Sequence, residues 1–294
     1  MQTPVGSARY TGMSGAFGAL GGDLSALSDN PAGIGIFRRS EFSFSLGLDQ
    51  HTSETRFGTN PLRRDSKGRI NLPQIGIIGA NPVDHPFWRR VNFAVTHNRL
   101  ASFNETYISE GNQVNNSLLE VFAQQANGLT PEEIYDFLPF GAALAWDAFL
   151  INPIDTLGTL QYNSVNPYGD YNVRKTIDRQ GHMGETVVSI GGSYDDRFYI
   201  GGNIGFPTIN FVETTTYTEN QLEAEHELDQ FTYTEELNTS GRGINFKLGV
   251  IYKITELLRF GAAWHSPSFL TINDTYVTDM TAVYKDGERF NIEG

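Results

Sequence analysis

The stretch from Ile244 to Lys253 reads Ile-Asn-Phe-Lys-Leu-Gly-Val-Ile-Tyr-Lys and points to the fold class. Its large apolar side chains recur at every second position as far as Tyr252, with small or charged residues between most of them. Successive side chains of a β-strand point to opposite faces, so this alternation predicts a strand with one apolar and one polar face. The sequence therefore leads us to expect an all-β fold.

Six other segments show the same period of two. They cover residues 42–49, 74–80, 91–96, 188–194, 198–206 and 258–265, which makes seven predicted strands in total. Gly, Ser, Asn and Ala dominate their polar face, whereas the solvent face of a soluble sandwich is usually rich in Lys, Glu and Thr. The pattern favours a transmembrane antiparallel β-barrel, with the apolar face towards lipid and the polar face towards a lumen.

Composition excludes several classes of protein. The chain has 294 residues, a formal net charge of −13 and no cysteine. The negative charge argues against a nucleic-acid partner, because such proteins need a basic surface. The absence of cysteine excludes disulfides and Cys-based zinc sites, and no window reaches the ~18 apolar residues of a transmembrane helix. Residues 1–6 do not have the pattern of a signal peptide, which we expect to have been removed.

The predicted connections alternate between short and long. We expect tight turns over 194–197 and 254–257, a moderate turn over 81–89, and long loops over 50–72, 97–182 and 212–241. Short turns at one end and long loops at the other are typical of outer-membrane barrels. Phe87 and Trp88 at a short-turn end either begin an aromatic girdle or are incidental surface residues. The acidic run from Glu213 to Glu236 is expected to be a solvated loop, with binding of a divalent cation or lipopolysaccharide as the minority alternative.

The longest connection contains helical patterns. Residues 117–126 are amphipathic, and Thr130-Pro-Glu-Glu133 has the pattern of an N-cap, a proline at N1 and two acids in the first turn. We expect a helical extracellular loop over about 109–181. Its apolar residues either bury the face of a helical hairpin or form a capture surface, because large exposed apolar patches usually mark binding sites. The candidate ligand-binding residues are Phe122, Ile134, Phe137, Leu138, Phe140, Trp146 and Phe149.

Residues 1–40 differ from the rest of the chain. Eight glycines lie between Gly6 and Gly35, with small residues among them and no strand alternation. A short helix over 23–28 is expected to stop before Pro31, because the residue preceding a proline avoids the α region. The sequence therefore predicts a compact irregular plug over 1–40, followed by barrel strands over 41–294.

This N-terminal segment carries a resemblance to a known family. Residues 6–34 resemble the N-terminal hatch of the FadL/TodX outer-membrane transport family (the OMPP1 family), and Asn30-Pro31-Ala32 matches its Asn-Pro-Ala motif. Residues 246–267 resemble the family's mid-barrel hairpin, and Arg9-Tyr-Thr-Gly-Met13 resembles Bacteroidetes members. The resemblance implies a 14-stranded barrel with the hatch inside, so seven strands would be about its first half. It also implies that Phe17, Asn30, Pro31 and Ala32 are hatch or gate residues.

The resemblance further implies a function. The family takes up long-chain fatty acids or similar lipophilic molecules passively across the Gram-negative outer membrane, through capture at the loops, a shift of the hatch and lateral exit into the bilayer. The expected partners are a hydrophobic small molecule or lipid, the outer membrane and lipopolysaccharide. The alternative is a FadL-like scaffold or shuttle in type IX secretion or lipopolysaccharide handling, with a protein partner in the cell envelope.

We expect no catalytic residue, no metal site and no cofactor, and hence no enzyme. The six histidines show no ligand-type spacing such as His-x-x-x-His. A barrel lipase would need a Ser–His pair, and the pair at His265 and Ser266 is adjacent in sequence. Neighbouring side chains on a strand point to opposite faces, so this pair does not form a catalytic dyad.

Overall fold

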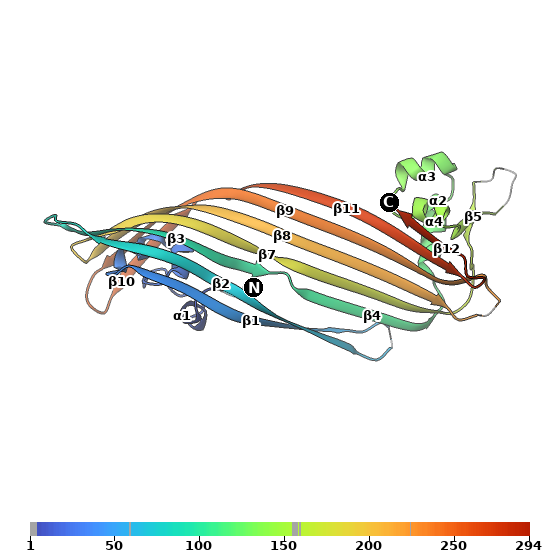
Figure 1. Ribbon diagram of the computed structural model, residues 1–294, viewed down its shortest axis with the longest axis horizontal. Coiled ribbons are helices and arrows are strands. Elements are labelled where there is room, and N and C mark those ends of the chain that lie inside the picture. The colour runs from blue at the N-terminus through green and yellow to red at the C-terminus, as the bar shows by residue number, and fades with distance from the viewer. Residues whose placement is uncertain (1–4, 59, 155–157, 159, 224) are drawn as a thin grey trace.

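A single large antiparallel sheet dominates the structure. The computed structural model describes residues 5–294 apart from 59, 155–157, 159 and 224. Along the sheet the strand order is β1-β2-β3-β7-β8-β9-β11-β12, with β4 also beside β7 and β10 also beside β9 (Figure 1). Within the described residues this sheet is open, with β1 at one edge and β12 at the other. None of the described helices is long and apolar enough to cross a membrane.

The strands are long in the middle of the sheet and short at its last edge. Their bounds are β1 Glu41–Thr55, β2 Arg63–Pro82, β3 Trp88–Ser102, β4 Glu105–Val114, β7 Tyr171–Tyr194, β8 Phe198–Gln221, β9 Leu228–Lys253, β10 Arg259–His265, β11 Phe269–Tyr284 and β12 Arg289–Glu293. All seven predicted strands are present, as β1, β2, β3, β7, β8, β9 and β10, but the expected total of about seven is too low, because β4, β11 and β12 also belong to this sheet. The all-β antiparallel class is therefore confirmed.

Two strand positions are interrupted, which the alternation did not predict. β3 and β4 both pair with β7 and are separated at Phe103, whose N–H donates to the carbonyl of Gly181 at 3.1 Å. β10 and β11 both pair with β9 and are separated by Ser266-Pro267-Ser268. Proline has no N–H to donate to a neighbouring strand, which accounts for the second break.

The three short connections are confirmed. Asp195, Asp196 and Arg197 connect β7 to β8. The two aspartates have φ of 51° and 50°, and the N–H of Arg197 donates to the carbonyl of Tyr194 at 3.1 Å, which is the type I′ pattern of hairpins. Phe87 stacks on Tyr194 and Trp88 packs edge-on against it, with ring centroids 5.6 and 5.7 Å apart, so the two predicted girdle residues share one aromatic cluster.

The expected long loops over 50–72 and 212–241 are wrong. Strands β1 and β2 extend to leave only 56–62 between them, and β8 and β9 extend to leave only 222–227. None of the extensions shows a sustained apolar alternation. Those of β8 and β9 are rich in Thr and Tyr, which favour strands, whereas the β2 extension over 63–72 contains neither residue and gave no such signal. The acidic run from Glu213 to Glu236 is therefore mostly strand and not a solvated loop. Within it Glu219 is 2% exposed, and burial raises the pKa of its carboxyl group.

The helical region lies beyond the end of β4 and is narrower than expected. It contains α2 (Leu118–Ala126), α3 (Pro131–Phe137), α4 (Ala142–Asp147) and the short pair β5 (Ile151–Pro153) and β6 (Tyr162–Ser164). Ser117 caps α2, and Thr130 and Glu133 form a capping box on α3, so both predicted N-termini are confirmed. The 109–181 range is too wide because its two ends belong to β4 and β7.

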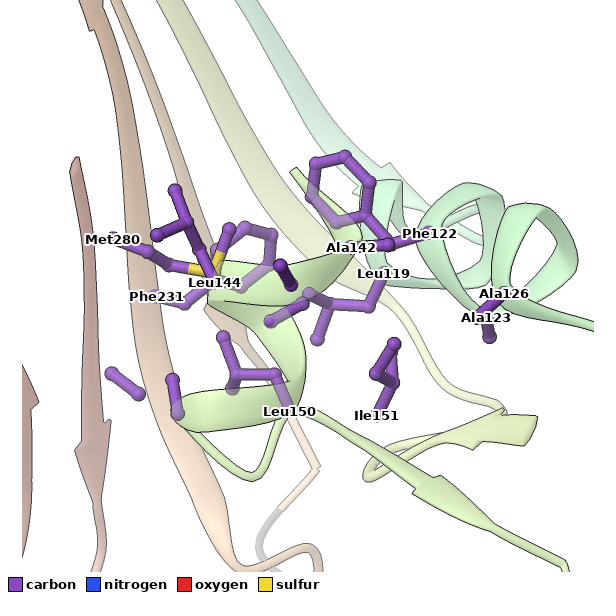
Figure 2. Close-up of a cluster of buried hydrophobic side chains, with 14 of the residues drawn as sticks. Leu119, Phe122, Ala123, Ala126, Ala142, Leu144, Leu150, Ile151, Phe231 and Met280 are labelled. Atoms are coloured by element: carbon purple, nitrogen blue, oxygen red, sulfur yellow. The ribbon is translucent and has the colours of Figure 1, made fainter. Parts of the chain in front are cut away.

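One apolar core fixes this helical region to the sheet. Figure 2 shows side chains of α2 and α4 meeting Phe231 of β9 and Met280 of β11. The N–H of Leu118, at the start of α2, also donates to the Glu219 carboxylate of β8 at 3.2 Å. The helices thus sit over the ends of three strands.

The N-terminal segment packs against one face of the sheet near its other end (Figure 1). It folds into α1 (Ala8–Gly12) and two 3-10 helices, η1 (Ser25–Ser28) and η2 (Pro31–Ile36). The expected short helix before Pro31 is confirmed as η1. We call residues 5–37 the hatch, the sheet face beneath them the hatch face, and the opposite face the outer face.

Candidate functional site

The hatch is seated on a row of residues without bulky side chains. Gly191, Gly201 and Gly249 are register partners on β7, β8 and β9, and Asn92 and Ala263 continue the row on either side. We call these five residues the glycine row. A side-chain carbon at Gly201 would overlap the carbonyl oxygen of Pro31, and one at Gly249 would overlap the side chain of Asn30. The strand backbone at these glycines therefore lies against η2 at a distance that only a residue without a side chain permits.

Asparagine side chains of the sheet hydrogen-bond the hatch. The amide of Asn92 donates to the carbonyls of Ile34 and Phe37 at 2.8 and 2.9 Å. The amide of Asn203 donates to the carbonyl of Leu27 at 2.7 Å. The carbonyl of Ile34 also accepts from the N–H of Phe37 at 3.3 Å, so the asparagines add to the hydrogen bonds that the hatch makes within itself. They hold the hatch by pairing with its backbone carbonyls.

The predicted hatch residues lie together at this contact. Asn30 caps η2 by accepting from the N–H of Ala32 at 3.0 Å, and its amide donates to the carbonyl of Gly18 at 2.6 Å. The same amide lies 3.3 Å from the carbonyl of Val250 on β9. Pro31 and Ala32 are buried against the glycine row, so the Asn-Pro-Ala motif forms the interface itself.

Phe17 lies elsewhere in the hatch. Its ring is fully buried and packs against Tyr10 with centroids 5.6 Å apart. It belongs to a small internal cluster with Ala26 and does not line the contact with the sheet. Its position is that of a core residue of the hatch.

A buried ion pair lies on the hatch face next to this contact. Lys247 Nζ of β9 is 2.7 Å from Glu185 Oε2 of β7, and the two side chains are 9% and 2% exposed. Asn245 donates to the other carboxylate oxygen at 2.8 Å. The pair spans β8 because the intervening residue is Gly205, whose missing side chain leaves room for the carboxylate. Sequence alternation placed Lys247 on the polar face but could not indicate a partner two strands away.

The outer face carries a band of exposed apolar side chains at the level of the hatch. We call the following residues the apolar band: Phe42, Phe44, Leu46, Leu48, Ile77, Phe93, Val95, Val188, Ile190, Ile200, Ile204, Phe206, Phe246, Leu248, Tyr252, Phe260 and Trp264. On β8 its members run from Ile200 to Phe206, and with the half-buried Phe198 before them this apolar stretch covers residues 198–206, roughly 30 Å of strand at ~3.3 Å per residue.

The apolar band ends abruptly. Beyond it, the outer face of β8 continues as Thr208, Asn210, Val212 and then threonines, and Thr208 pairs with Arg242 of β9. The outer face therefore changes from apolar to polar at one level of the sheet.

The structure divides the candidate ligand-binding residues into three groups: buried, half-buried and exposed. Phe122 and Ile134 are buried in the helical core, so the alternative of a helical hairpin burying its own face holds for them. Leu138 and Trp146 are half-buried against that core. Phe137, Phe140 and Phe149 are 67%, 47% and 56% exposed, and they keep the hypothesis of a capture surface.

Two other features bear on chemistry. Nε2 of His265 lies 2.7 Å from the backbone carbonyl of Asp29, and the hydroxyl of Ser266 donates to the carbonyl of Pro267 at 2.9 Å. Both groups thus contact backbone carbonyls. In the part of the chain that the structure describes, no three His, Cys, Asp or Glu residues are grouped so that they could hold a metal ion.

Comparisons with known proteins assign no family. No protein-family model matches the sequence, and no curated protein matches it. Among solved structures, a mutant of the Rh. blastica porin aligns over 86% of this chain and 100% of its own, with 11% sequence identity and a TM-score of 0.12. A TM-score this low does not establish a shared fold.

The glycine row leads to a first testable prediction. Gly201→Val places a branched side chain against the Pro31 carbonyl, whereas Gly202→Val places it on the outer face against the flexible end of Leu248. We expect hydrogen exchange of the amides in η2 to accelerate by at least about tenfold in the first variant and to stay near wild type in the second, since exchange reports local opening. Hydrogen exchange with mass spectrometry measures this, and equal exchange in the two variants would contradict the proposed seat.

Proposed function

We propose that this chain is part of an outer-membrane β-barrel in which the hatch gates passive uptake of hydrophobic compounds, such as long-chain fatty acids or similar lipophilic molecules. One observation carries the proposal: the apolar band covers the outer face at the same level at which the hatch covers the other face. A sheet with lipid on one side and a plug on the other needs this arrangement.

The dimensions of the apolar band support a membrane position. Its length of roughly 30 Å on β8 matches the 9–11 residues with which a tilted strand crosses a bilayer core. The resemblance of residues 6–34 to the FadL/TodX hatch supports the gating role. Phe137, Phe140 and Phe149 at the opposite end of the sheet supply exposed apolar surface for a first encounter with a lipophilic molecule.

A direct uptake measurement tests the proposal. A Gram-negative host that lacks its own fatty-acid transporter is made to produce the protein from its full-length gene, and uptake of radiolabelled oleate is compared with that of cells carrying an empty vector. We expect the producing cells to take up oleate several-fold faster than the cells with the empty vector. This corresponds to an apparent activation barrier for uptake that is lower by on the order of 1 kcal/mol or more. Uptake at the level of the vector, with the protein present in the outer membrane, rejects the transport role.

A further inference from the structure

A cavity lies at the end of the sheet that is remote from the hatch. Its volume is about 690 Å³, within the ~300–1,000 Å³ of typical small-molecule pockets. It forms where the helical region, the β8–β9 connection and the β11–β12 turn meet. Its lining residues are Phe149, Asn152, Val165, His226, Glu227, Tyr284, Lys285, Asp286, Glu288 and Phe290.

Aromatic rings form one wall of this cavity. The ring of Phe290 packs edge-on against Phe149 and against Tyr284, with centroids 5.3 and 5.7 Å away. The hydroxyl of Tyr284 donates to the carbonyls of Ala148 and Phe149 at 3.1 Å each, which fixes the tyrosine ring. Aromatic faces carry partial negative charge and attract cations.

The charges in the lining are mainly negative. The lining contains three carboxylates, those of Glu227, Asp286 and Glu288, and one ammonium group, that of Lys285, whose Nζ donates to the backbone carbonyl of Glu223 at 2.6 Å. Burial, and then these three carboxylates, raise the pKa of Tyr284 to about 12. The cavity therefore disfavours a carboxylate ligand and favours a positive one.

His226 supplies an independent indication of a ligand. It is 9% exposed, and its ring packs on Tyr168 with centroids 4.8 Å apart. Its Nε2 is buried and has no hydrogen-bond partner among the residues that the structure describes. Buried polar atoms are almost always hydrogen-bonded, so this nitrogen is available to a polar group bound in the cavity.

We propose that this cavity binds a lipophilic organic cation, namely an ammonium group that carries an aromatic or alkyl substituent. The ammonium group lies between the acidic side chains and the aromatic wall, while the substituent packs against Val165 and Phe290. Nε2 of His226 meets a polar group of the ligand or a water bound with it. This proposal does not depend on the proposed uptake role. Binding is measured on purified protein and requires no passage across a membrane, so either proposal can fail without the other.

Three probes of similar ring and different charge test the proposal. Isothermal titration calorimetry on the purified protein in lipid nanodiscs compares benzyltrimethylammonium, benzyl alcohol and benzoate at low salt. We expect the cation to bind at least about tenfold more tightly than benzoate, with the alcohol between them. No saturable binding of the cation, or equal binding of cation and benzoate, overturns the proposal.

A charge-removal variant and a matched control locate the site. Glu227→Gln, Asp286→Asn and Glu288→Gln together remove the negative charge, and asparagine at 286 keeps the oxygen that accepts from the N–H of Glu288. We expect cation affinity to fall about tenfold while alcohol affinity stays within about twofold, which also shows that the cavity is intact. The control combines Glu132→Gln with Asp136→Asn on α3, outside the lining. Equal weakening of the cation in both variants overturns the assignment.

Discussion

A disulfide between positions 30 and 249 is expected to stop uptake. A carbon at the Cβ position of Gly249 would lie 3.0 Å from Cγ of Asn30, whose own Cβ is one bond further. That spacing is compatible with the ~3.5–4.5 Å between Cβ atoms of a disulfide. These 294 residues contain no cysteine, so within this chain the Asn30→Cys, Gly249→Cys variant has a single possible pair. If the hatch must leave the glycine row for passage, locking it there closes the path.

The measurement is oleate uptake by cells producing this variant before and after a reductant. We expect at least about a tenfold loss in the oxidised protein and recovery on reduction, since the disulfide is the only change between the two states. The two single-cysteine variants are the controls, because they carry each substitution without the tether. Unchanged uptake in fully oxidised protein, verified by the absence of free thiols, would show that the hatch does not move during uptake. The proposal for the cation-binding cavity would not be affected by that result.

Removing the charge of Lys247 is expected to give the largest loss of stability. Lys247→Met keeps the length of the side chain but leaves the buried carboxylate of Glu185 without its ion-pair partner. Breaking a buried pair on one side costs about 3–5 kcal/mol, because the remaining charge stays out of water. Equilibrium unfolding in urea, followed by tryptophan fluorescence in detergent, measures the change.

Two further variants give this prediction its controls. Lys253→Met on the same strand removes an ion pair with Glu256, which is 88% exposed, and we expect it to leave the unfolding midpoint almost unchanged. Lys247→Met combined with Glu185→Leu removes both charges and is expected to recover most of the stability, because no unpaired charge is then left. A double variant as unstable as Lys247→Met alone would show that packing, not charge, is responsible.

The strands could be predicted from the sequence only where one face is apolar. Phe246, Leu248 and Tyr252 mark β9 clearly because they alternate with small or charged residues. The N-terminal half of the same strand, from Leu228 to about Gly241, has the apolar pair Phe231 and Tyr233 on one face but is otherwise mostly polar on both faces. Periodicity therefore gives only a short signal there. Strand propensity from Thr and Tyr was the remaining signal, and it is weak over a short segment.

The types of residue that form the hatch contact could be predicted from the sequence, but their alignment across the strands could not. Glycines on the polar face of β7, β8 and β9 are visible in the sequence, but their alignment into one row depends on the strand register. Register places Gly191 opposite Gly201 across the β7–β8 hairpin, and it brings Gly249, much further along the chain, next to Gly201. The ion pair between Glu185 and Lys247 also depends on strand register, because register decides which residues of β7 and β9 lie near each other across β8.

The helical residues show a different limit. Apolar character alone does not separate Ile134, which is fully buried, from Phe137, which is 67% exposed. The two lie on the same short helix, and only the way in which α3 packs against α4 decides which side chain enters the core. A helix of seven residues is too short for its own periodicity to settle this.

The length of β8 determines how far from the membrane the helical region first contacts a ligand. From Thr208 to Gln221 the strand continues beyond the apolar band for roughly 40 Å at ~3.3 Å per residue. In the proposed membrane orientation this stalk lifts the helical region above the lipid headgroups and into the surrounding sugar layer. A site at that height samples molecules from the aqueous phase, before they partition into lipid. Solubility in water, and not only affinity for a bilayer, then limits which compounds reach the protein.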